Sequence, residues 1–331
     1  MNREATRRFY NDYYSSPNFK VWKDELVREL YTCLNSNIGS GEVKTVTDLC
    51  NAISNKQYKG LRLESKKMHS RSTSGVEFDY IDKKAVTELA DMVIVSVVTL
   101  DRRIVLLKTA FIQNKKATHH KTTSNSWGID QKQLFLLKNF PTFNGVSGTF
   151  RGQTVTFLNQ SGTLGNYGLF SSSGDIILLT ARNTFCNQNA SGNITFDSIK
   201  NAATSTTMQN YYNACYSRHK CCPDCFEQRN HFAPFLQTNN MPFFSNYSYA
   251  LDAHEVVKEL THFNIGEPSS AFGEVINENL YYFTDKLLHS IFGYSISDNY
   301  FNRNRGYSDK ILDDGGISVL LNHLELDENS N

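Results

Sequence analysis

The sequence has no hydrophobic run long enough to cross a membrane. Its longest apolar stretch, Met92–Val98, is interrupted by Ser96 and is far too short for a bilayer. The first fourteen residues also have no apolar core of the kind that a signal peptide needs. We therefore expect a cytoplasmic protein without a membrane partner.

An excess of either charge is also missing, because 34 Lys and Arg face 33 Asp and Glu, a net charge of +1. This balance excludes a uniformly basic coat for nucleic acid. Local imbalances remain: residues 56–71 and 102–121 each contain six Lys or Arg, and residues 309–331 are acidic. Basic segments in a neutral chain predict a local site for an anion.

Several catalytic motifs are absent. The chain has no phosphate-binding Gly-x-x-x-x-Gly-Lys loop, no dinucleotide fingerprint and no Gly-x-Ser-x-Gly elbow around a serine. If nucleotide energy is used, a partner supplies it. The 331 residues contain 40% hydrophobic and 12% aromatic residues and only 6 prolines, so an ordered core of one large or two ordinary domains is expected.

Apolar spacing predicts alternating helices and strands in the first part of the chain. The expected helices are 18–34, 47–55 and 129–139, and the expected strands are 76–80, 92–100, 104–113, 154–158, 167–170 and 176–181. The basic stretch 56–71 shows no period and is interpreted as a loop. After residue 195 the pattern is mainly helical, with candidate helices near 196–215, 252–263, 279–292 and 316–324. This order predicts an α/β core with a helical C-terminal addition.

The most informative residues lie at the ends of two predicted neighbouring strands. Asp91 begins one strand, and Gln113 and Lys115 end the next. Alternate residues on a strand face the same side, so Gln113 and Lys115 project together. If the turn at 101–103 joins the two strands as a hairpin, ten residues on each side bring Asp91 to the same end as this pair.

Phosphodiester hydrolysis uses these residue types together. Carboxylate and amide oxygens are ligands that Mg²⁺ accepts, and the cation lowers the pKa of an attacking water molecule. A lysine ammonium at the same edge stabilises the developing negative charge. The alternative interpretation is an ordinary β-hairpin with a capping aspartate and an edge lysine.

On these residues the sequence resembles the PD-(D/E)XK nuclease superfamily over residues 18–185, and in particular its Gln-x-Lys branch. Similar Gln-x-Lys cores occur in effector nucleases of bacterial anti-phage systems of CBASS and Lamassu type. The resemblance implies a restriction-endonuclease-like αβββαβ core in residues 1–190. The shift of composition near residue 190 predicts a mainly helical region in residues 191–331, which we interpret as a regulatory or interaction region. It also implies a DNA endonuclease that depends on Mg²⁺ or Mn²⁺.

In that resemblance Asp91 and Gln113 hold the cation and Lys115 is the catalytic lysine. A glutamate of the first helix often adds a ligand in such families. Glu29 is the expected one because it shares a helix face with Trp22, Leu26 and Cys33, whereas Glu25 lies on the wet face. Glu88, three residues before Asp91, is the alternative.

The resemblance implies the role of killing subunit in an anti-phage complex, controlled by a regulatory protein partner, such as an ATPase, or by homo-oligomerisation. An amide binds Mg²⁺ more weakly than a carboxylate, so the second hypothesis is a non-cutting subunit that binds nucleic acid or a partner protein. Candidate DNA contacts, by phosphate binding, are Lys116, His119, His120, Lys121, Gln133, Lys66 and Lys67. Their alternative is ordinary solvated surface.

Four of the seven cysteines crowd into eleven residues: Cys215, Cys221, Cys222 and Cys225. Cys222-Pro-Asp-Cys225 is a Cys-x-x-Cys pair of the kind that binds structural Zn²⁺, with His219, His231 or Cys186 as further ligands. No second Cys-x-x-Cys exists, so reduced cysteines in a helix hairpin are the alternative. The odd number of cysteines argues against a disulfide framework.

Overall fold

The computed structural model describes most of the chain. The described residues are 11–67, 75–117, 125–147, 150–157, 162–187, 192–199, 249–297, 300–303 and 317–326. The helices considered below are α2 (Pro17–Ser36), α3 (Glu42–Ile53), α4 (Gln131–Asn139), α5 (Ala181–Asn187), α9 (Ala253–Thr261) and α10 (Glu278–Phe292). Among the described residues no helix is both long enough and apolar enough to span a membrane.

The strands alternate with these helices, so the protein has a mixed α/β fold. Up to α5 they are β1 (Lys56–Tyr58), β2 (Leu61–Lys67), β3 (Gly75–Tyr80), β4 (Lys83–Glu88), β5 (Met92–Leu100), β6 (Arg103–Lys116), β7 (Ser126–Gly128), β8 (Phe143–Gly145), β9 (Thr154–Val155), β10 (Gly165–Phe170) and β11 (Ile176–Thr180). Later strands are β12 (Asn193–Thr195), β13 (Tyr249–Ala250), β14 (Glu267–Ala271), β15 (Glu274–Val275), β16 (Tyr294–Ser297), β17 (Tyr300–Arg303) and β18 (Ser318–Leu326).

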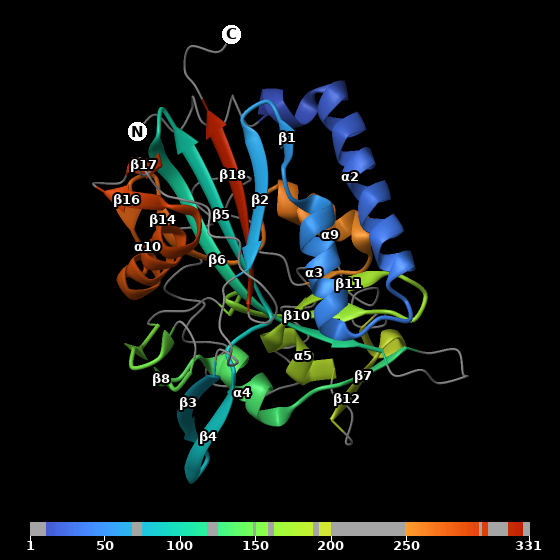
Figure 1. Cartoon of the computed structure of the whole chain (residues 1–331), viewed down its shortest axis with the longest axis vertical. Coiled ribbons are helices and arrows are strands. Elements are labelled where there is room, and N and C mark those ends of the chain that lie inside the picture. The colour runs from blue at the N-terminus through green and yellow to red at the C-terminus, as the bar shows by residue number, and fades with distance from the viewer. Residues whose placement is uncertain are drawn as a thin grey trace, which may run out of the picture.

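The main sheet is mixed and runs in the order β1-β2-β18-β5-β6-β10-β11-β13. β5 and β6 form an antiparallel hairpin, β10 lies parallel to β6, and α4 lies between β6 and β10 in the chain. β18 runs parallel to β5 and antiparallel to β2, between the two (Figure 1). A second sheet, in the order β4-β3-β8-β9, lies at one end of the main sheet (Figure 1).

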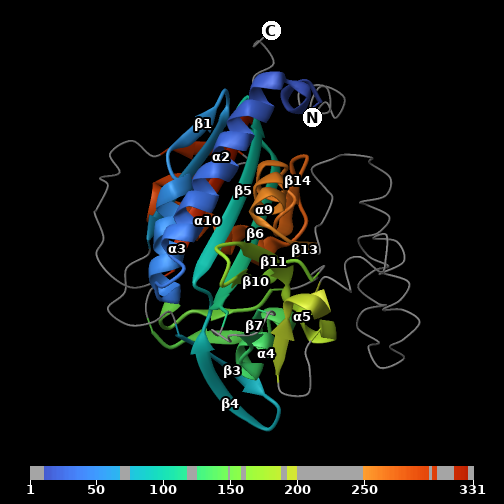
Figure 2. The same cartoon turned by 90° about the vertical axis from the view of Figure 1, so that its right-hand side faces the viewer.

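The hydrophobic core lies on both faces of the main sheet. On β5, Val93 and Val95 pack in one cluster with residues of α4 and α10, whereas Met92 and Ile94 pack in another with residues of α2, α3 and α9. Figure 2 shows α2 and α3 lying along the long strands. Because both faces are covered, every residue of β5 is buried, and the strand has a continuous apolar sequence.

Most of the predicted elements are confirmed. Helices at 18–34, 129–139, 252–263 and 279–292 correspond to α2, α4, α9 and α10, and the predicted hairpin strands correspond to β5 and β6. The short helix predicted at 47–55 begins earlier, at Glu42. The helix predicted near 196–215 lies mostly outside the described residues.

Two predicted elements are wrong. The stretch 56–71 is not a loop in its described part, because it contains β1 and β2, with Leu61 and Leu63 buried and Arg62 exposed between them. The helix predicted near 316–324 is the strand β18, whose residues are almost all buried. A short, continuously apolar segment has the same sequence signature in a buried helix and in a buried strand.

The residues after 190 do not form a separate helical layer in the part that the structure describes. α9 and α10 are helices there, but β14, β17 and β18 pair with strands of the main sheet. The mainly helical region predicted for 191–331 therefore contributes strands to the same sheet as residues 56–180.

Candidate functional site

Asp91 and Gln113 meet at one end of the β5–β6 hairpin, as the sequence predicted. The amide nitrogen of Asp91 donates a hydrogen bond of 3.0 Å to the carbonyl oxygen of Ile112, so the antiparallel ladder extends to Asp91. The two-residue connection at Asp101 and Arg102, both with positive φ, sets the register of the hairpin. Local chain geometry thus places these two side chains opposite each other.

The carboxylate of Asp91 is held by two donors from β6. Gln113 Nε2 lies 2.5 Å from Asp91 Oδ2, and the backbone nitrogen of Asn114 lies 2.6 Å from the same oxygen. Gln113 is only 2% exposed, whereas Asp91 reaches the surface. The Asp91 carboxylate is therefore held by two donors of β6 in a half-buried position.

Glu42 joins this end of the sheet from the first turn of α3. Its Oε1 lies 3.8 Å from Lys115 Nζ, and its Oε2 accepts a hydrogen bond of 3.2 Å from the backbone nitrogen of Lys116. An acid in the first turn of a helix is favoured by the helix dipole. Packing of α3 against the end of β6 thus adds a carboxylate beside the lysine.

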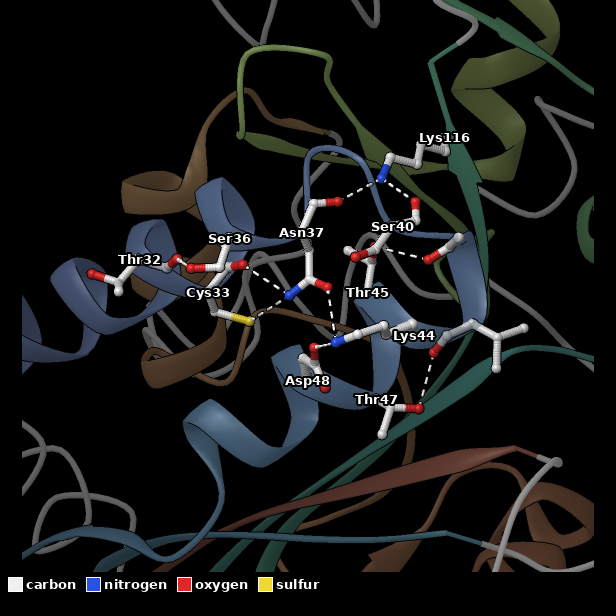
Figure 3. Close-up of polar contacts among 12 residues, drawn as sticks. Thr32, Cys33, Ser36, Asn37, Ser40, Lys44, Thr45, Thr47, Asp48 and Lys116 are labelled. Atoms are coloured by element: carbon white, nitrogen blue, oxygen red, sulfur yellow. Dashed lines mark hydrogen bonds and ion pairs between the residues drawn. The ribbon is translucent and has the colours of Figure 1, made fainter.

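Lys116 positions the loop that leads into Glu42. Its Nζ donates to the carbonyl oxygens of Asn37, at 2.6 Å, and of Ser40. Figure 3 shows the lysine above this loop, with the Asn37 side chain turned toward Lys44. Since its ammonium is engaged by backbone carbonyls, Lys116 holds the loop between α2 and α3. Its role as a DNA contact stays a prediction.

Glu88 is the third acid near Asp91. It ends β4, and the two residues between it and Asp91, Leu89 and Ala90, are fully buried and anchor the connection. Burial raises the pKa of Glu88, Lys115 opposes the rise, and Glu42 adds to it. Glu88 therefore belongs to the same electrostatic cluster.

The cluster changes the protonation of Asp91. Burial raises its pKa from 3.8 to about 7; Glu88 and Glu42 add to this rise, while the hydrogen bond from Asn114 and the charge of Lys115 oppose it. Burial also raises the pKa of Glu42, and Lys115 lowers it. Close carboxylates that are costly to ionise together are typical of a site that receives positive charge.

The donor set fits a hard cation. Asp91, Glu42 and Glu88 offer carboxylate oxygens, and the buried Gln113 Oε1 has no hydrogen-bond partner within the described residues. Among all the residues that the structure describes, no group of three or more His, Cys, Asp or Glu side chains forms a preformed metal-binding cage. Mg²⁺ is usually bound by one or two carboxylates together with water and substrate phosphates, so a preformed cage is not required.

Glu29 does not lie in this cluster, contrary to the ligand role predicted for it. Its carboxylate pairs with Lys56 Nζ at 2.6 Å, and it lines an open groove of about 700 Å³ between α2 and α3. It is not among the groups that shift the pKa of Asp91. Glu29 and Leu26 do belong to the same helix, as predicted. The acid beside Lys115, however, is Glu42 of α3 and not a residue of α2.

The remaining predicted residues fall in three places. Lys66 and Lys67 end β2, with Lys66 Nζ 5.6 Å from the centre of the Phe292 ring. Gln133 is half-buried in the first turn of α4, where its backbone nitrogen donates a hydrogen bond to the capping carboxylate of Asp130. The others lie outside the residues that the structure describes: His119, His120, Lys121, Cys215, Cys221, Cys222 and Cys225.

Sequence reasoning missed Glu42. The available signal was an acidic residue directly after Gly39 and Gly41, where one helix ends and the next begins. Predicting the second helix to begin at 47 placed Glu42 in a loop and concealed this signal.

No protein-family model, curated protein or solved structure matches the chain.

Proposed function

We propose that this protein is a metal-dependent endonuclease that hydrolyses phosphodiester bonds of DNA. The observation that carries the proposal is the grouping of Asp91, Gln113 and Lys115 at one sheet end with two further acids, Glu42 and Glu88. These are residue types that phosphodiester hydrolysis uses, with the charged groups half-buried and the amide buried beside them.

The order of elements supports the nuclease-like core that the sequence resemblance implies. When β1, β3, β4, β7, β8 and β9 are left out, α3, β2, β5, β6, α4 and β10 give the chain order helix, three strands, helix and strand, with β10 parallel to β6. The departures from the simple pattern include the short strands β1, β7, β8 and β9, the β3–β4 hairpin inserted before β5, and β18 between β2 and β5. None of these interrupts the β5–β6 hairpin that carries the site.

In the proposed mechanism Asp91 and Gln113 hold Mg²⁺ or Mn²⁺, with Glu42 or Glu88 as the further acid. The cation would supply charge neutralisation at the phosphate and a water molecule of lowered pKa. Lys115, whose Nζ lies 3.8 Å from Glu42 Oε1, stabilises the negative charge that develops on the phosphate. Gln113 also orients the Asp91 carboxylate through its Nε2 donor.

The biological role rests on the sequence resemblance. We propose that the protein is the cutting subunit of an anti-phage complex, kept in check by a regulatory partner or by assembly with other copies. The absence of nucleotide-hydrolysis motifs in the sequence is consistent with a separate ATPase partner.

The second candidate is a non-cutting subunit that uses the same fold to bind nucleic acid or protein. The feature that favours it is Gln113, where an amide takes the place of a stronger carboxylate ligand.

A cleavage assay separates the two. Supercoiled plasmid is incubated with the purified protein and Mg²⁺ or Mn²⁺, in parallel with Lys115→Ala and with Lys84→Ala, a lysine on the exposed β4 edge. The proposal expects nicking by the wild type and Lys84→Ala, a loss of about 10²-fold or more in Lys115→Ala, and none with EDTA.

A nuclease that depends on a regulatory partner does not cut DNA in the absence of that partner. The same proteins are therefore also titrated with Mn²⁺. Manganese binding that is lost in Asp91→Asn supports the nuclease site even without cutting. Absence of both cutting and manganese binding, with DNA binding retained equally in all variants, would establish the non-cutting subunit instead.

A further inference from the structure

Tyr167 lies beside Gln113 on the adjacent strand. β10 pairs with β6 in parallel, and the register sets Tyr167 against Gln113. Both Tyr167 and Phe111, two residues before Gln113, pack in the core cluster on one face of the sheet. Since alternate residues share a face, the side chains of Gln113 and Tyr167 lie on this same face.

Both side chains bury a polar atom that has no partner. Tyr167 is 0% exposed, and its hydroxyl makes no hydrogen bond within the described residues; the same holds for Gln113 Oε1. Buried polar groups in proteins are nearly always paired with protein or ordered water, and leaving one unpaired costs free energy. A phenylalanine would fill the same volume without that cost, so packing does not explain the hydroxyl.

The hydroxyl is close to the charges of the candidate site. After burial, the strongest influences that raise the pKa of Tyr167 are the carboxylates of Asp130 and Asp91. Asp130 caps α4, where its Oδ1 accepts from the backbone nitrogens of Lys132 and Gln133. Asp91, whose carboxylate accepts a hydrogen bond from Gln113 Nε2, is therefore among the charges that act on the Tyr167 hydroxyl.

We infer that Tyr167 is a positioning residue of the cation site, whose hydroxyl binds a water molecule of the hydration shell of the cation held by Asp91 and Gln113. Mg²⁺ retains several water ligands, and second-shell partners orient them. This inference rests on the proposed function and deepens it, because it assigns a partner to the cation's water.

The test compares Tyr167→Phe with Tyr13→Phe. Tyr13 is also a buried tyrosine, but its hydroxyl already donates to the carbonyl oxygen of Tyr58, at 3.3 Å. Two quantities are measured: the dissociation constant for Mn²⁺ by calorimetry, and the urea midpoint of unfolding in EDTA.

For Tyr167→Phe we expect manganese affinity to fall by about 10- to 100-fold, with an unchanged or higher urea midpoint in EDTA. Tyr13→Phe should do the opposite, lowering the midpoint and leaving manganese affinity unchanged. This opposed pair of results separates a positioning hydroxyl from a structural one.

The other outcomes overturn the inference and are distinguishable from each other. If the wild type binds Mn²⁺ and Asp91→Asn does not, but Tyr167→Phe binds like the wild type, the proposed function stands and the role of Tyr167 fails. A lower urea midpoint for Tyr167→Phe in EDTA marks a structural hydroxyl. If the wild type binds no Mn²⁺, the cation site and the role of Tyr167 fail together.

Discussion

The backbone amide of Ser318 donates a hydrogen bond of 3.0 Å to the carbonyl oxygen of Asp91. Ser318 begins β18, which enters the sheet between β2 and β5 from far along the chain. Asp91 is thus fixed on one side by Ile112 of β6 and on the other by β18. The backbone of the site acid is therefore hydrogen-bonded to a strand that comes more than 200 residues later in the chain.

Ser318→Pro removes the donor of this hydrogen bond at the first residue of a strand, where proline is tolerated. We expect the free energy of unfolding to fall by about 1–3 kcal/mol and the Mn²⁺ affinity to fall with it. Ser318→Ala keeps the backbone donor and is the matched control. Equal manganese affinity in the two variants would show that β18 does not position Asp91.

Asp91→Asn should stabilise the metal-free protein in a pH-dependent way. The folded-state pKa of about 7 lies above the unfolded value of about 3.9, so the folded state retains a proton that the unfolded state has released. For the wild type, the free energy of unfolding therefore falls as the pH rises from about 4 to 7. The variant lacks this loss.

In urea unfolding with EDTA, the gain of Asp91→Asn over the wild type should grow from near zero at pH 4 to about 1–4 kcal/mol at pH 8. Asp79→Asn, at an exposed carboxylate, is the control and should show no comparable growth. A gain for Asp91→Asn that is independent of pH would contradict the raised pKa.

Glu42→Gln and Glu29→Gln test which helix supplies the site acid. Glutamine can still accept the hydrogen bond from the Lys116 backbone, so Glu42→Gln removes charge with little change in shape. We expect Glu42→Gln to weaken Mn²⁺ binding by about 10-fold or more. Glu29→Gln should change stability by less than about 1 kcal/mol and leave metal binding intact.

Titration calorimetry of the two variants provides the check. If Glu29→Gln weakens Mn²⁺ binding more than Glu42→Gln does, the acid of the cation site comes from α2 and not from α3.

Lys108 offers a test of the core away from the site. It is fully buried on β6, and burial lowers its pKa to about 7, while Glu267 and Glu259 oppose the decrease. Glu267 is also fully buried and accepts a hydrogen bond of 2.8 Å from the Thr163 hydroxyl.

Lys108→Met should therefore lower the free energy of unfolding by about 3–5 kcal/mol, because it removes a buried positive charge that interacts with the buried Glu267. Adding Glu267→Gln should recover part of this loss, as measured by a double-mutant cycle in urea. Simple additivity of the two changes would mean that the charges do not interact.

The sequence by itself determined the hairpin and the meeting of Asp91 with Gln113. Continuous apolar runs identified β5 and β6, and the short turn between them brought their far ends together to within one residue. A register shift between Val98 and Thr99 sets the final pairing. The hairpin is a local feature, since the pairing partner of each residue follows, to within that one-residue shift, from its distance to the turn. The amphipathic spacing of α2, α4 and α10 was readable for the same reason.

Only the tertiary structure decided the rest of the site. Glu42 reaches Lys115 because α3 packs on the end of β6, and Tyr167 lies beside Gln113 because β10 returns parallel to it. β18 occupies the middle of the sheet because it pairs with both β2 and β5. These partners lie more than 200 residues earlier in the chain. No local pattern encodes such a pairing, since an apolar segment buries the same surface against any partner of matching shape.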